Sequence, residues 1–82
     1  MIRVVFFASI REALDTASVE LEITTPADID SVIQALGQRG PMWLETLQQE
    51  NILVAVNQTM TDQTFMLEDG DELAFFPPVT GG

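Results

Sequence analysis

The group most able to react is the terminal carboxyl group, which follows the two glycines Gly81 and Gly82. Glycine has no side chain, so a narrow channel in a partner can close around this backbone and reach the terminal carboxyl group. Pro77 and Pro78 cannot donate hydrogen bonds to a neighbouring strand and favour an extended chain. We therefore expect residues 77–82 to form an extended arm. The residues expected to enter the partner are Pro77, Pro78, Val79, Thr80, Gly81 and Gly82.

The side chains that the sequence lacks exclude most catalytic chemistry. There is no histidine and no cysteine, hence no common general base near neutral pH, no thiol nucleophile and no usual zinc site. The acidic residues 69–71 lack the ligand spacing and closing glutamate of a calcium loop, so we interpret them as a turn. We expect the chain to bind no metal and no cofactor, and to take part in catalysis only as a substrate or carrier.

Charge bears on the choice of partner. The chain has three arginines, no lysine and thirteen acidic residues, for a formal net charge of −10. A polyanion repels nucleic acid and anionic lipid, and the scattered Arg3, Arg11 and Arg39 form no basic cluster. We therefore expect a basic protein partner, with no binding to nucleic acid or membrane. Without lysine, only the amino group of Met1 remains to accept the chain's own carboxyl group.

Length and composition indicate one small domain. The 82 residues are 46% hydrophobic, and without cysteine the core must form by packing alone. The longest apolar run is too short to span a membrane, and the first residues lack the features of a signal peptide. These features predict a cytoplasmic protein.

The elements that position the tail follow from hydrophobic periodicity. Residues 2–8 form a first strand with Ile2, Val4 and Phe6 on one face, and with Arg3 and a partly exposed Phe7 on the other. We expect residues 9–16 to hold a single helical turn that ends in a connection. Alternation across residues 18–23 predicts a second, antiparallel strand.

A main helix follows, with Thr25 as its cap and Pro26 at its first position. Gly37 and Gly40 bracket its expected end. Its apolar stripe consists of Ile29, Val32, Ile33 and Leu36.

In the second half of the sequence we expect a series of short helices, strands and turns. We expect a second short helix at residues 41–49, in which Trp43 covers the core. A strand at 52–56, a polar turn at 57–61, an extended piece at 65–67 and an acidic turn at 68–71 come next. The last expected element is a strand at 72–76.

The two faces of the last strand differ: Leu73 and Phe75 point to the core, whereas Phe76 points away from it. This order predicts an α+β fold, a β-grasp whose mixed sheet is covered by one main helix plus a short second helix. Residues 1–76 would form the domain and residues 77–82 the tail. If the last strand lies parallel to the first, Phe76 comes close to Phe7. We expect Phe7, Met60 and Phe76 to form the partner interface.

The C-terminal residues resemble a known family. The sequence of residues 69–82, DGDELAFFPPVTGG, is similar to the ubiquitin-like sulfur carriers, and within them to the small subunits of bacterial molybdopterin synthases. Residues 55–59, residues 5–8 and the pair Arg11 and Glu12 support the resemblance, which spans nearly the whole chain but is looser between residues 24 and 51.

The resemblance implies a mechanism. An enzyme similar to the ubiquitin-activating enzyme would use ATP to adenylate the Gly82 carboxylate, and a sulfur donor would replace AMP to leave a thiocarboxylate. The tail would then enter the large synthase subunit and deliver sulfur to cyclic pyranopterin monophosphate. Three alternatives remain open: a carrier for thiamine or tRNA thiolation, a ubiquitin-like modifier of protein amines, and an interaction module with a frayed end.

Overall fold

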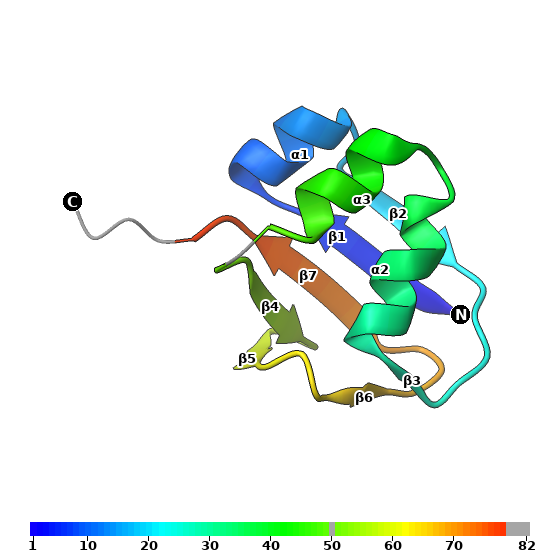
Figure 1. Ribbon diagram of the computed structural model, residues 1–82. Coiled ribbons are helices and arrows are strands. Elements are labelled where there is room, and N and C mark those ends of the chain that lie inside the picture. The colour runs from blue at the N-terminus through cyan, green and yellow to red at the C-terminus, as the bar shows by residue number, and fades with distance from the viewer. Residues whose placement is uncertain (50, 79–82) are drawn as a thin grey trace.

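The computed structural model describes residues 1–49 and 51–78. Its elements, in chain order, are β1 (Ile2–Phe6), α1 (Ala8–Leu14), β2 (Ser18–Leu21), β3 (Ala27–Asp28), α2 (Ile29–Gly37), α3 (Pro41–Leu47), β4 (Leu53–Val56), β5 (Thr59–Thr61), β6 (Met66–Leu67) and β7 (Glu72–Phe76). A five-stranded sheet has the order β2-β1-β7-β4-β5, and β3 pairs with β6 in a separate small sheet (Figure 1). The predicted α+β class with a mixed sheet is confirmed.

The middle of the large sheet joins the two ends of the domain. β1 lies parallel to β7, with Phe6 opposite Phe75, and pairs on its other side with antiparallel β2. β7 is antiparallel to β4, which is antiparallel to β5. The predicted return of the last strand to lie parallel beside the first is therefore confirmed.

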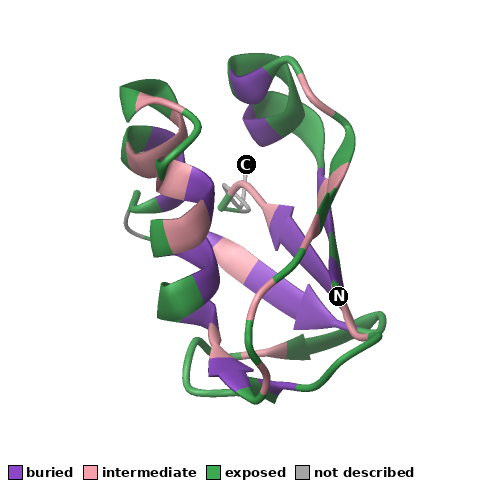
Figure 2. Cartoon of the chain, turned by 90° about the vertical axis from the view of Figure 1, so that its right-hand side faces the viewer, coloured by how far each residue is buried: buried purple, intermediate pink, exposed green. Residues whose placement is uncertain are grey.

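The core lies between the helices and one face of this sheet (Figures 1 and 2). The apolar stripe predicted for the main helix is buried as a whole: Ile29, Val32, Ile33 and Leu36. Each such side chain contributes roughly 1.5–3 kcal/mol when it is fully buried. Trp43 packs against this core and meets Phe6 edge to face at 5.5 Å, which confirms its predicted covering role.

The start of the main helix differs from the prediction. Asp28, not Thr25, is the N-cap, and its side chain accepts a hydrogen bond of 2.8 Å from the Ser31 amide. Ala27 and Asp28 also pair with residues 66–67 in the small sheet. Because these two residues are held in extended conformation, the helix cannot begin at Pro26.

Two other elements are more regular than predicted. Residues 9–16 were expected to hold a single turn, but α1 spans seven residues and buries Ile10 and Leu14. The expected polar turn at 57–61 is wrong beyond its first two residues, because β5 follows them and pairs with β4. Within the described part of the chain, none of the helices has the length and apolar character needed to cross a membrane.

Candidate functional site

The end of β7 separates two phenylalanines. Because side chains alternate along a strand, Phe75 points into the core and is 0% exposed, whereas Phe76 lies on the opposite, open face and is half-buried. Phe75 stacks on Phe6, with ring centroids 6.0 Å apart. The predicted assignment of the two faces is confirmed.

The open face carries a second aromatic pair. Phe7 stacks on Phe76 with ring centroids 4.7 Å apart and an interplanar angle of 4°. The Phe7 amide donates to the Phe75 carbonyl at 3.2 Å, which continues the parallel pairing one residue past β1. Phe7 remains 43% exposed. The predicted proximity of Phe7 and Phe76 is thus confirmed, and their role in binding stays a prediction.

Strand β5 brings Met60 to the same face. Asn57 and Gln58 both have positive φ, 50° and 71°, as a two-residue type I′ hairpin turn requires. The Asn57 side chain anchors this turn: it accepts from the Glu72 amide and donates to the Asp71 carboxylate, each at 3.0 Å. Met60 then lies opposite Ala55 on β4 and is 56% exposed.

These side chains line an apolar groove of about 530 Å³. Its lining residues are Phe7, Ala8, Leu53, Met60, Phe76, Pro77 and Pro78. We call this the docking groove. It unites all three predicted interface residues with the first two residues of the tail. The predicted tail residues Val79 to Gly82 lie outside the described residues, and the boundary between domain and tail stays a prediction.

Two residues of the docking groove, Ala8 and Leu53, were not predicted. Leu53 lies opposite Phe76 in the register of β4 and β7 and therefore shares its open face. The signal was present, because Leu53 alternates with the buried Val54 along the strand. Ala8 has positive φ at the start of α1, a turn geometry that the sequence did not indicate.

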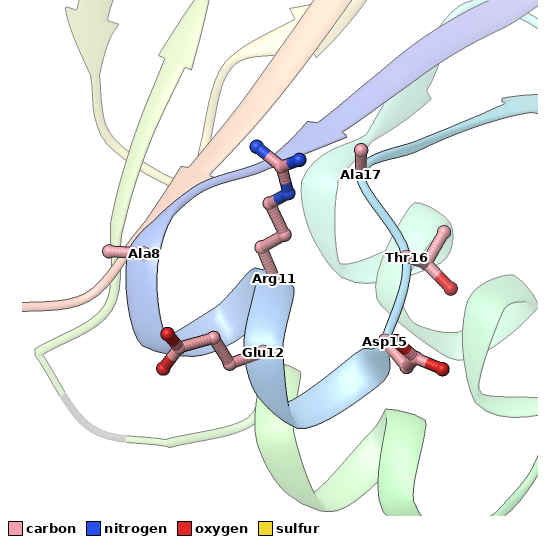
Figure 3. A pocket seen from close by; sticks show the side chains of 6 residues that line it. All are labelled: Ala8, Arg11, Glu12, Asp15, Thr16 and Ala17. Carbon is pink, nitrogen blue, oxygen red and sulfur yellow. The ribbon is translucent and has the colours of Figure 1, made fainter.

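A second, polar hollow lies beside α1 (Figure 3). Arg11 projects over it, whereas the carboxylates of Glu12 and Asp15 point in different directions and do not converge on a common point. Among the described residues, no group of three or more acidic side chains could hold a metal ion.

In the described part of the chain, Asp28 and Asp62 each accept hydrogen bonds from a residue close to them in sequence, and their pKa is lowered as a result. The side-chain and backbone hydrogen bonds from Ser31 lower the pKa of Asp28, and those from Thr64 lower the pKa of Asp62. Both groups therefore remain ionised at neutral pH. An ionised carboxylate accepts hydrogen bonds, whereas a general acid must hold its proton and would need a raised pKa.

Comparison with known proteins gives the family. The model of the ThiS family matches residues 4–82. The chain belongs to the ThiS family. It is 42% identical, over the full length of both chains, to the molybdopterin synthase sulfur carrier subunit of Escherichia coli (strain K12). It is 35% identical to the protein of the same name from Mycobacterium tuberculosis, covering 99% of this chain and 96% of that protein. The predicted family is confirmed.

Solved structures share the fold of this chain. Small archaeal modifier protein 1 from Haloferax volcanii superposes with a TM-score of 0.79 at 26% identity, over 95% of this chain and 97% of that one. The predicted ubiquitin-like β-grasp is therefore confirmed. That neighbour is named as a modifier and the two curated relatives are named as sulfur carriers, so fold alone does not separate these functions.

Proposed function

We propose that this protein is a sulfur carrier subunit of molybdopterin synthase. The observation that carries the proposal is the full-length match, 42% identical, to a protein of that name. The docking groove supports it, because an exposed apolar surface at the root of residues 77–82 is suited to hold a partner while the tail reaches further. We expect the active site on the large subunit, because this chain has no histidine and no cysteine.

The reactive group of the proposal is the Gly82 carboxylate. An activating enzyme similar to the ubiquitin-activating enzyme would join it to AMP from ATP, with release of pyrophosphate. Sulfur from a donor system would then replace AMP and leave a thiocarboxylate. Adenylation is needed because a free carboxylate is a poor acylating group. In this proposal, the activating enzyme binds ATP and uses it for adenylation.

The second half of the cycle takes place on the large subunit. There the thiocarboxylate would give its sulfur to cyclic pyranopterin monophosphate, as a step toward the dithiolene of molybdopterin. The task of this chain is positioning. Phe7, Met60 and Phe76 would dock on the partner, so that Pro77 and Pro78 direct the remaining four residues into its active site. We place this cycle in the cytoplasm, where a protein without cysteine needs no oxidising compartment to fold.

Intact mass spectrometry tests the proposal directly. The protein is incubated with ATP, the activating enzyme and a sulfur source, and a parallel sample lacks ATP. We expect a mass gain equal to one oxygen replaced by sulfur, only with ATP. The product should then convert cyclic pyranopterin monophosphate when the large subunit is added. A chain that gains sulfur but fails in this second step would belong to another thiolation pathway.

A protein modifier is the second candidate, favoured by the superposition on small archaeal modifier protein 1. Such a modifier would form an amide with a lysine of a target. This chain has no lysine of its own, and the amino group of Met1 pairs with the Asp69 carboxylate. Activated protein mixed with lysine-bearing proteins distinguishes the two functions. A sulfur carrier leaves free thiocarboxylate, whereas a modifier yields conjugates of higher mass.

A further inference from the structure

We propose that Met60 is an oxidation-sensitive modification site, and that its conversion to methionine sulfoxide by a peroxide weakens docking of the protein to the large subunit. The inference rests on the proposed function, which assigns the docking groove to that partner. Met60 is exposed, it carries one of the four side-chain sulfur atoms of the chain, and its surroundings are apolar.

Met60 is open to solvent. It sits in the middle of β5, the last strand at one edge of the large sheet, and its side chain is 56% exposed. A peroxide can therefore reach the sulfur. In the reaction, the sulfur lone pair attacks one peroxide oxygen, an S–O bond forms and the O–O bond breaks. The second oxygen takes the remaining proton and leaves as water or an alcohol.

The chain contains no competing thiol. It has four methionines and no cysteine, so thioethers are its only side-chain sulfur atoms. Met1, Met42 and Met66 are also exposed, by 46%, 56% and 49%. A peroxide can therefore reach all four, and the consequence of each oxidation depends on where the methionine lies. Of the four, only Met60 lines the docking groove.

The surroundings of Met60 make a sulfoxide costly on docking. Every residue that lines the groove carries an apolar side chain. In the free protein the new oxygen can bond to water. In the docked complex it would be enclosed among Phe76, Leu53 and an apolar partner surface, and a buried polar group without a partner is strongly unfavourable. We expect oxidation of Met60 to weaken docking by about tenfold, within the usual range for such a group.

A matched pair of variants tests this. Wild type, Met60→Leu and Met42→Leu, all with the unmodified carboxylate, are treated with hydrogen peroxide, which is then removed by catalase. Met42 is the control because its exposure equals that of Met60 and it lies outside the docking groove. Peptide mass spectrometry measures sulfoxide at each position, circular dichroism checks the fold, and calorimetry measures affinity for the large subunit.

The expected result is a loss of about tenfold in affinity on oxidation of wild type and of Met42→Leu. The affinity of Met60→Leu, relative to its own value before treatment, should change by less than about twofold, because it has no thioether in the groove. Reduction of oxidised wild type by methionine sulfoxide reductases should restore the original affinity.

Two results overturn the inference alone: full conversion of Met60 with unchanged affinity in wild type, or an equal loss in oxidised Met60→Leu. Failure of the untreated wild type to bind the large subunit would overturn the proposed function, and the inference with it.

Discussion

Two stacked phenylalanine pairs lie one residue apart in the same parallel strand pairing, and their surroundings are opposite. Phe6 and Phe75 stack inside the core, where both are almost fully buried. Phe7 and Phe76 stack on the open face, where Phe7 is 43% exposed. The inner pair has an evident role in stability, since large aromatic side chains dominate the energetics of a small core. The outer pair leaves apolar surface in water, which folding does not require.

We therefore expect the two adjacent residues Phe75 and Phe76 to serve folding and binding separately. A change on the inner face should act on stability, a change on the outer face should act on docking, and a change beyond Pro78 should act on chemistry alone.

The largest effect is expected in the tail. Adding one alanine after Gly82, or deleting Gly82, should abolish sulfur transfer. Each extended residue moves the carboxyl group by ~3.3–3.6 Å, and reacting atoms must lie within ~3–3.5 Å of each other. Thiocarboxylate formation and pterin conversion are the measurements, with a thermal melt as the control.

Because the groove is unchanged, the extended variant should still bind and should compete with wild type for the large subunit. A normal rate of pterin conversion by the alanine-extended protein would show that the Gly82 carboxyl group is not the reactive centre.

The second-largest effect is expected for the inner pair, Phe6 and Phe75. Phe75→Ala should lower the free energy of unfolding by about 3–5 kcal/mol, because it removes a fully buried ring and leaves a cavity. Chemical denaturation followed by Trp43 fluorescence measures this, and Phe76→Ala is the matched control on the other face. Equal unfolding midpoints for Phe75→Ala and wild type would contradict the assignment of the faces.

The third-largest effect is expected for the outer pair, Phe7 and Phe76. Phe76→Arg should weaken binding to both the activating enzyme and the large subunit by at least about 2 kcal/mol, as expected for a central aromatic residue of an interface. The fold should be largely retained. Phe65→Arg is a suitable control, because Phe65 is 40% exposed yet lies outside the docking groove. Calorimetry with unchanged affinity for both partners would rule out the groove as a docking surface.

The smallest effect concerns the cap of α2. Asp28→Ala should lower the thermal midpoint by a few degrees, because the Ser31 amide loses its acceptor. Since the folded-state pKa of Asp28 is lowered, its contribution is present above the ordinary aspartate pKa of about 3.9. It is lost as the pH falls through the lower folded value. Melts of wild type and variant should therefore differ at neutral pH and converge in strong acid, without any change in docking at pH 7.

Patterns that depend on one element alone were predicted well from the sequence. The stripe of α2 repeats with helical spacing and was buried as expected, and alternation in β7 placed Phe75 and Phe76 on the correct faces. In both cases the period of the element decides the direction of each side chain. Such information is contained in consecutive residues.

What the sequence did not indicate depends on contacts between distant residues. Thr25 and Asp28 are both good caps, and the pairing of β3 with β6 selects Asp28. Similarly, Asn57 and Gln58 form a tight hairpin turn without the glycine that usually marks one. The Asn57 side chain is held instead by the start of β7. Neither the cap at Asp28 nor the turn at residues 57–58 can be predicted from a short stretch of the sequence.

The parallel pairing of β1 with β7 also bears on how the protein is made. Arg3 is the register partner of Glu72, so the centre of the sheet closes only when almost the whole domain is available. Contacts of such long sequence separation slow folding. During synthesis, β1 can pair with β2 early, but its pairing with β7 must wait until β7 has left the ribosome. A chain cut short before β7 would lack the middle strand of its sheet and would be open to proteases. In the cell, folded copies with a complete docking groove should therefore be those in which synthesis has passed through β7 and on toward the tail.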